Sequence, residues 1–158
     1  MILYFLRHGL AGNRSEWEGD DRLRPLTKKG KDQLEASARL MDKLELGLDL
    51  IITSPLVRSR QTAEVVAEGL DMARKMVEDE RLSPGFGLDA LAEIVKERCD
   101  LGAIMLVGHE PDFSETIQEL TGGRVVCKKG SLARIDLTSE EPPQGVLVWL
   151  LQPKVLAV

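Results

Sequence analysis

The sequence predicts a single-domain α/β protein with a three-layer open sheet that is mostly parallel and has helices on both faces. Apolar runs typical of buried strands alternate with amphipathic helical patterns along the chain, and this alternation builds parallel sheets. The length of 158 residues suits one domain. Apolar residues make up 43% of the chain, and folding at this length buries roughly 68 to 70% of the unfolded surface. We therefore expect residues 1–158 to form one domain around an aliphatic core, stable without a disulfide or a metal.

The first half of the chain is predicted to hold two strands and two helices. Ile2–Leu6 is a continuous apolar run, as in a strand buried on both faces of a parallel sheet, and Leu50–Thr53 is the next such run. Thr27 is a suitable N-cap for the first helix. The second helix is expected to have Ser54 as its cap and Pro55 in its first turn. The apolar faces are Leu34, Ala38, Met41 and Leu44 in the first helix, and Leu56, Ala63, Val66, Ala67 and Leu70 in the second.

The second half continues the alternation and ends in two strands. Lys75–Val77 is a weak strand candidate and Ala103–Val107 a strong one. Ser131–Leu137 and Gly145–Gln152 flank a turn rich in proline and glycine, so we expect them to pair as a hairpin. Two helices complete the pattern, one with Leu88, Leu91, Ala92, Val95 and Cys99 on one face, the other opened by Pro111 and Asp112 and carrying Phe113, Ile117 and Leu120.

Charge and cysteine content exclude several classes of protein. The net charge of −5 argues against a nucleic-acid surface, because counterion release needs many cations on one face. The first apolar run stops at Arg7, too early for a signal peptide or a membrane span. Cys99 and Cys127 lack the spacing of a redox or zinc pair and are expected to be packing residues in a reducing compartment. We expect a cytoplasmic protein that binds neither nucleic acid nor membrane.

Both histidines of the chain follow predicted strands. His8 comes two residues after the first strand and His109 two residues after the strong strand of the second half. In open α/β sheets, ligands bind beyond the carboxyl ends of the strands. Considered singly, either histidine could be a structural residue of the core whose ring nitrogens are hydrogen-bonded to the protein. Arg7 and Gly9 flank the first one, which adds a cation and a flexible backbone.

Arg58 is predicted to lie in the first turn of the second helix, close to free backbone N–H groups that favour anions. For this arginine taken alone, a solvated surface charge is an equal alternative. Arg7 and Arg58 together with His8 and His109 form a set of donors suited to a tetrahedral dianion, with bidentate guanidinium contacts around its oxygens.

Four motifs together resemble the histidine phosphatase superfamily, which has a phosphoglycerate-mutase-like fold. They are Arg7-His8-Gly9, Arg24-Pro25-Leu26-Thr27 with Gly30, Ser54-Pro55-Leu56-Val57-Arg58 with Gln61-Thr62-Ala63, and Gly108-His109. Their order and spacing match along nearly the whole chain. The short length, without room for the helical insertion of larger members, is most similar to the SixA-type branch of phosphohistidine phosphatases.

The resemblance implies a role for each site residue. His8 would be the nucleophile that becomes phosphorylated, Arg7 and Arg58 would bind the phosphoryl group, and His109 would complete the pocket. Such a transfer needs no metal and no other cofactor. Flanking guanidinium groups favour a neutral, nucleophilic imidazole by lowering its pKa. Gly9 is expected to leave room for the phosphoryl group.

One segment departs from the pattern of the superfamily's mutases and monoesterases. Those proteins resemble one another in a Leu-x-Glu segment whose glutamate protonates the leaving alkoxide, whereas this chain has Leu82-Ser83-Pro84. SixA-type proteins share the proline. An imidazole released from phosphohistidine is a better leaving group than an alkoxide and can take its proton from water. Glu80 and Asp79 are near in sequence and could act as substitute donors, although a solvated acidic run is the favoured interpretation of Glu78–Glu80.

The sequence therefore predicts a phosphatase that hydrolyses phosphohistidine in a protein through a covalent intermediate on His8. The resemblance suggests a histidine-containing phosphotransfer domain as the partner. The alternatives are a small-molecule phosphomonoesterase that uses Glu80 or another carboxylate as its acid and, less favoured, a non-catalytic phosphoprotein-binding module. Asp20 and Asp21, in the loop after the first strand, are assigned no role. Lys128-Lys129-Gly130 could contact an acidic partner, but a surface turn is the favoured interpretation.

Overall fold

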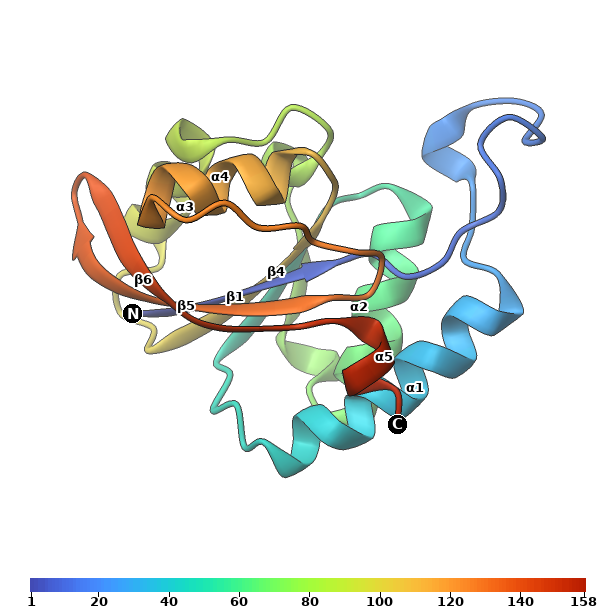
Figure 1. Ribbon diagram of the computed structural model, residues 1–158, viewed down its shortest axis with the longest axis horizontal. Coiled ribbons are helices and arrows are strands. Elements are labelled where there is room, and N and C mark those ends of the chain that lie inside the picture. Colours follow the sequence, from blue (N-terminus) through green and yellow to red (C-terminus); the bar gives the residue numbers. More distant parts are fainter.

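A computed structural model describes residues 1–158 as one six-stranded sheet with helices on both faces (Figure 1). The strands are β1 (Ile2–Arg7), β2 (Leu50–Thr53), β3 (Met76–Glu78), β4 (Ala103–Gly108), β5 (Leu132–Glu140) and β6 (Pro143–Leu151). Their order in the sheet is β3-β2-β4-β1-β5-β6. The first four strands are parallel, and β5 and β6 form an antiparallel hairpin beside β1. The mostly parallel α/β fold predicted from the sequence is confirmed.

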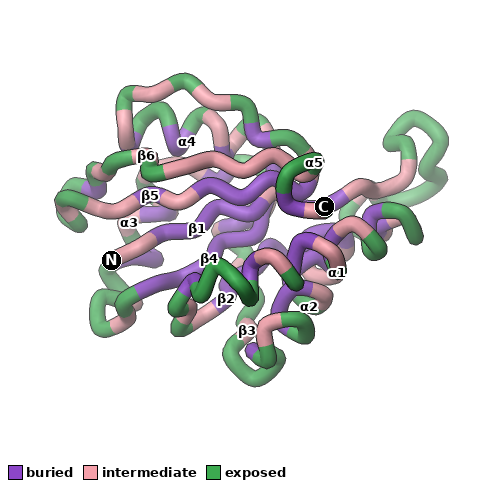
Figure 2. Tube along the Cα trace, turned by 60° about the horizontal axis from the view of Figure 1, so that its bottom comes forward, coloured by how far each residue is buried: buried purple, intermediate pink, exposed green.

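The helices divide between the two faces of the sheet. They are α1 (Lys28–Lys43), α2 (Val57–Gly69), α3 (Leu88–Glu97), α4 (Asp112–Thr121) and the short α5 (Pro153–Leu156), with single 3₁₀ turns at Asp21–Leu23, Ala73–Lys75 and Glu80–Leu82. Side chains of α1, α2 and α5 share one buried cluster with the sheet, and those of α3 and α4 share the other. Figure 2 shows the buried residues concentrated in the central strands between these layers. No helix has both the length and the apolar character needed to cross a membrane.

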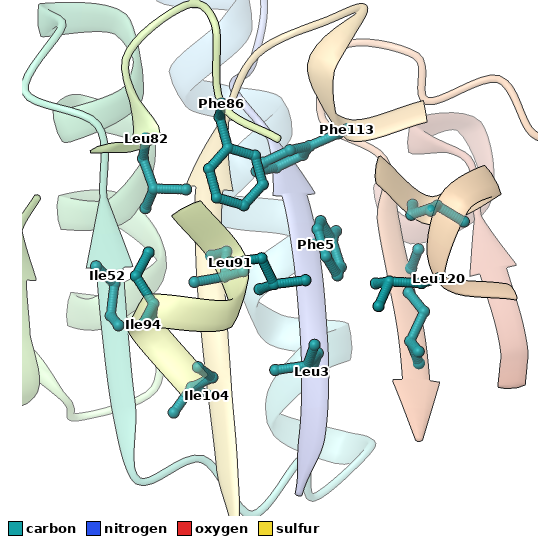
Figure 3. Close-up of a cluster of buried hydrophobic side chains, with 14 of the residues drawn as sticks. Leu3, Phe5, Ile52, Leu82, Phe86, Leu91, Ile94, Ile104, Phe113 and Leu120 are labelled. Atoms are coloured by element: carbon teal, nitrogen blue, oxygen red, sulfur yellow. The ribbon is translucent and has the colours of Figure 1, made fainter. Parts of the chain in front are cut away.

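Aromatic packing fixes α4 against the end of β4. The ring of Phe113 lies edge-on to Phe5, with centroids 5.0 Å apart, and to Phe86, with centroids 5.8 Å apart (Figure 3). A Cβ atom on Gly108 would come within 2.7 Å of the Phe113 ring, so the last residue of β4 must be glycine for α4 to pack this closely. The residue that follows, His109, is thereby held at the carboxyl end of β4.

The connections of β1 and β4 open a crevice between these neighbouring strands. β1 runs into α1 on one face of the sheet, and β4 runs into α4 on the opposite face. Where adjacent parallel strands send their connections to opposite faces, the loops separate and leave room for a ligand. His8 and His109 follow these two strands, so the fold brings both imidazoles to the same crevice.

Three local predictions are wrong. α2 begins at Val57, and Leu56 is its cap residue without a side-chain hydrogen bond; the Ser54 hydroxyl instead accepts the N–H of Leu56, so Ser54 and Pro55 precede the helix. Leu44 is exposed because α1 ends at Lys43, which places it in the cap. Cys99 is also exposed, since α3 ends at Glu97, whereas Cys127 is buried as expected.

Candidate active site

A polar cavity of about 600 Å³ lies at the carboxyl ends of β1 and β4. The residues that line it are Arg7, His8, Ala11, Gly12, Asn13, Arg14, Asp21, Arg24, Arg58, Pro84, His109, Glu110 and Lys129. One wall comes from the loop between β1 and α1, which projects at the right of Figure 1. Five lining side chains are cationic and two are carboxylates, so the cavity attracts anions although the whole chain is acidic.

His8 presents an unprotonated ring nitrogen. Its backbone N–H donates to the carbonyl of Gly108 over 3.0 Å, which ties the end of β1 to β4. Its Nδ1 lies 2.8 Å from the carbonyl oxygen of Gly9. Because a carbonyl can only accept, Nδ1 carries the proton and Nε2 keeps its lone pair. Burial, and to a smaller extent the charges of Arg58 and Arg7, hold the pKa of His8 well below its usual value, so the neutral nucleophilic form prevails at neutral pH.

His109 lies beside His8, with ring centroids 5.4 Å apart. Its Nε2 is 2.8 Å from the Ser54 hydroxyl and 3.4 Å from that of Ser59. The Ser54 oxygen accepts the Leu56 N–H, which leaves the hydroxyl proton free for Nε2 and the imidazole proton for Nδ1. Burial and the charge of Arg58 lower the pKa of His109 to about 4. His109 is therefore a neutral donor at neutral pH.

Two arginines approach the histidines from different parts of the chain. Arg7 ends β1, and its Nη1 donates to the carbonyl of Cys127 over 2.9 Å. Arg58 lies in the first turn of α2, as the sequence predicts, and is buried. The Nε atoms of both arginines and Nδ1 of His109 are buried donors without a partner in the protein. Unsatisfied buried donors are costly, and three of them on residues of one cavity indicate a site completed by an oxyanion.

Asp21 joins Arg58 to a further buried arginine. Its carboxylate lies 2.9 Å from Nε of Arg24 and 3.1 Å from Nη2 of Arg58, and its backbone carbonyl accepts from Nη1 of Arg58. Burial by itself would raise the pKa of Asp21, but the hydrogen bond from Arg24 and the charge of Arg58 lower it below its usual value. Asp21 is thus an ionised clamp and not a proton donor. Sequence reasoning missed it because loop position alone does not indicate a partner.

Glu80 lies outside the cavity. Its side chain is 77% exposed and pairs with Arg22 at 3.4 Å, and it accepts a hydrogen bond from Ser83. The Leu82-Ser83-Pro84 segment instead brings Pro84 to the cavity wall. A proton donor must come within hydrogen-bond reach of the leaving group, and the structure does not place Glu80 on the cavity wall, so this geometry does not support the sequence-based suggestion that Glu80 is the donor.

Gly9 is expected from the sequence to leave room for a phosphoryl group, and in the structure it packs against α1. Its N–H donates to Thr62 Oγ1, and a Cβ atom at this position would lie 2.8 Å from the side chain of Leu34 in α1. Gly9 is absent from the cavity wall, and its lack of a side chain makes room for Leu34 of α1. Lys129, by contrast, lines the cavity, although the sequence favours a surface turn at this position.

Glu110 is the second carboxylate of the cavity. Its two oxygens accept the backbone N–H and the hydroxyl of Ser114, at 2.9 and 2.6 Å. Ser114 in turn accepts the N–H of Cys127, the residue whose carbonyl holds Arg7. This chain of hydrogen bonds makes Glu110 an acceptor that supports Arg7. No cluster of three or more metal-ligating side chains accompanies it.

Comparison with known proteins identifies the family. The model of the histidine phosphatase superfamily (branch 1) matches residues 3–85. An uncharacterised protein of Picosynechococcus is 35% identical over 126 residues, which cover 78% of this chain and 75% of that protein. The phosphohistidine phosphatase SixA of Escherichia coli is 23% identical over 155 residues, covering 97% and 94% of the two chains.

Solved structures share the fold at low sequence identity. The protein histidine phosphatase SixA in complex with tungstate superimposes with a TM-score of 0.87 at 22% identity and covers 98% of both chains. A mycobacterial glucosyl-3-phosphoglycerate phosphatase gives a TM-score of 0.74 at 18% identity, covering 94% of this chain and 98% of that one. The family match spans more than half of the sequence and includes Arg7, His8 and Arg58, and on this basis the chain belongs to the histidine phosphatase superfamily.

Proposed function

We propose that the protein is a phosphohistidine phosphatase that acts on a phosphorylated protein. The observation that carries this proposal is a cavity in which a neutral, buried His8 stands among unpaired cationic donors while no carboxylate is placed to donate a proton. Asp21 is held ionised by two arginines, Glu110 accepts hydrogen bonds on both oxygens, and Glu80 lies elsewhere. Such a site suits a leaving group that departs without a strong acid.

The reaction would proceed in two displacements at phosphorus. Nε2 of His8 attacks the phosphoryl group, a new P–N bond forms, and the P–N bond to the substrate imidazole breaks. The released imidazole takes its proton from water. In the second step a water molecule attacks phosphorus, the bond to Nε2 breaks, and inorganic phosphate leaves. Arg7 and Arg58 stabilise the charge on the equatorial oxygens in both transition states.

The similarity to SixA supports this substrate class, since that relative is named a phosphohistidine phosphatase and is alike over nearly the whole chain. A small-molecule phosphomonoesterase is the second candidate. It is favoured by the similarity in fold to glucosyl-3-phosphoglycerate phosphatase, and a fragment of 67 residues is 46% identical to the 8-oxo-(d)GTP phosphatase of Mycolicibacterium smegmatis.

A substrate comparison tests the proposal. Phosphate release is measured from a histidine-phosphorylated phosphotransfer domain and from a panel of sugar and nucleotide monoesters. We expect the phosphohistidine protein to give the higher kcat/KM, and His8→Ala to reduce that turnover by about a thousandfold or more because the nucleophile is lost. Label from a ³²P-phosphohistidine substrate should be trapped on wild-type protein and not on His8→Ala.

Glu80→Gln is the matched control, because Glu80 is exposed and outside the cavity. Its turnover of the phosphohistidine protein should equal that of the wild type. The proposal fails if His8→Ala releases phosphate at the wild-type rate, or if monoesters are the preferred substrates. Preferred monoester turnover that Glu80→Gln abolishes would establish the second candidate, and absence of both turnover and trapping would indicate a binding module.

A further inference from the structure

Lys129 is held over the cavity by the strand that carries the proposed nucleophile. The next residue, Gly130, has a positive φ of 82°, a conformation that favours glycine. Its N–H lies within hydrogen-bond distance of the carbonyls of both Arg7 and His8, at 3.1 and 3.0 Å. The Ser131 N–H donates to the carbonyl of Lys128 and closes the turn. The backbone of Lys129 is therefore fastened directly beside the end of β1.

The ammonium group of Lys129 lies in an unfavourable electrostatic environment. Burial and the charges of Arg7, Arg24 and Arg58, all positive, lower the pKa of Lys129. By contrast, Arg24 and Arg58 share the carboxylate of Asp21, and Arg14 lies 3.9 Å from it. A cation among cations is destabilising unless an anion joins it, and such arrangements mark functional sites.

A single phosphoryl group leaves Lys129 without a counterion. Arg7, Arg58 and His109 each have a buried donor without a partner in the protein, and the proposed function assigns these three donors to the phosphoryl oxygens. The cavity has a volume of about 600 Å³, and three further cationic residues line it, Arg14, Arg24 and Lys129. Of these, Arg14 and Arg24 face the carboxylate of Asp21. Space and positive charge therefore remain beside the phosphoryl position.

We propose that Lys129 forms a second anion subsite, which binds a carboxylate of the substrate next to its phosphoryl group. This inference rests on the proposed function and narrows it: the preferred substrate protein carries an acidic side chain close to the phosphorylated histidine. Lys129 then selects among substrates and takes no part in the transfer itself. Lys129 is a partly buried residue, so its ammonium group would make a charge-assisted hydrogen bond to the carboxylate that is stronger than the same contact in open solvent.

Inert phosphonates of graded length test the subsite. The probes are phosphonoacetate, phosphonopropionate and phosphonobutyrate, each compared by calorimetry at constant ionic strength with its own carboxylate methyl ester. In the wild type, at least one free acid should bind about tenfold more tightly than its ester. Lys129→Met keeps the length of the side chain and removes its charge, and it should abolish this advantage while leaving the Kd of the esters unchanged.

Lys128→Met is the matched control, because Lys128 is exposed and absent from the cavity wall; it should preserve the advantage. The subsite proposal is overturned if no acid binds better than its ester, if the advantage survives in Lys129→Met, if Lys128→Met removes it equally, or if Lys129→Met weakens the esters as much as the acids. Binding is measured without turnover, so failure of the subsite and failure of phosphohistidine hydrolysis give separate results.

Discussion

Asp21 is the residue on which the position of Arg58 depends. Its carboxylate and its backbone carbonyl both accept from the guanidinium of Arg58, and the same carboxylate holds Arg24. Arg24 in turn donates to the carbonyl of Gly12 over 2.6 Å. A guanidinium held at several points is pre-organised for a planar contact with phosphoryl oxygens. Asp21 therefore acts as a positioning residue, through Arg58.

Asp21→Asn should separate positioning from charge. The substitution removes a negative charge from the pocket, which favours binding of an anionic substrate. It also weakens the contacts that hold Arg58, so Arg58 stabilises the charge of the transition state less well. We expect kcat to fall by about tenfold with KM unchanged or lower, and Asp21→Glu to recover part of kcat. Asp20→Asn is the control, because Asp20 is exposed and its carboxylate accepts only from the Arg22 backbone N–H. A raised KM with unchanged kcat would refute the positioning role.

At the scale of the element, the start of α1 closes the loop that forms one wall of the site. Thr27 caps the helix as the sequence predicts, its hydroxyl oxygen accepting the N–H of Gly30 over 3.0 Å. The backbone N–H of Thr27 donates to the carbonyl of Leu10 over 2.9 Å. Gly30 is buried against that same carbonyl, so closely that a Cβ atom would collide with it. The loop and the helix can meet only because residue 30 has no side chain.

Gly30→Ala should consequently destabilise the protein. The collision is with backbone, which cannot move aside as a flexible side chain does, and we expect a loss of about 1 to 3 kcal/mol in the free energy of unfolding measured with urea. Gly12→Ala is the control within the same loop, because a Cβ atom there meets nothing within 4 Å; its unfolding free energy should change by less than ~0.5 kcal/mol. Equal stability of the two variants would contradict this account of the helix start.

At the scale of the whole molecule, keeping two imidazoles neutral links stability to pH. The pKa of His109 falls to about 4 in the folded state, against a reference of about 6.5 in an unfolded chain. As the pH falls below 6.5, the unfolded chain takes up a proton that the folded protein does not, so folding loses free energy until the pH reaches the folded-state pKa. His8, whose pKa is also lowered, adds to this loss.

Urea unfolding at two pH values tests this linkage. Between about pH 7.5 and about pH 5, His109 alone should reduce the unfolding free energy by about 2 kcal/mol. His109→Gln keeps a polar group that cannot titrate, so this variant should lose about 2 kcal/mol less over the same interval. If the wild type and His109→Gln lose the same free energy, His109 is not held neutral by the fold.

Much of the fold and the centre of the site could be predicted from local patterns. Apolar runs such as Ile2–Leu6 and Ala103–Val107 predicted buried strands, because a strand covered on both faces of a sheet needs apolar side chains at consecutive positions. His8 and His109 could be placed at one sheet edge because parallel strands end on the same side. The structure brings both together with Arg7 and Arg58, as predicted. These inferences used the order of residues, the geometry of parallel strands, the position of Arg58 at the start of a helix and the motifs that resemble the superfamily.

Where the sequence-based expectations and the structure differ within the site, the difference lies in contacts between segments that are distant in the sequence. Glu80 is near Pro84 in sequence, yet its carboxylate turns to Arg22 and leaves the cavity. The local sequence suggests that Gly9 leaves room for a ligand, but the structure shows the side chain of Leu34 in α1 beside it. Nothing in their local sequence indicates that Asp21 clamps Arg58 or that Lys129 lines the cavity.

The sequence by itself therefore determined the class of fold, the single domain and the four residues at the heart of the site. The fold follows from periodicity, and the four residues follow from their positions at strand ends or in the first turn of a helix, together with the motifs that resemble the histidine phosphatase superfamily. Only the tertiary structure decided which groups surround them. The insertion of β4 between β2 and β1, with α1 and α4 on opposite faces, sets the crevice into which Asp21, Lys129 and Pro84 converge. Those contacts join residues far apart along the chain, and their energies depend on burial and mutual distance, which exist only once the chain has folded.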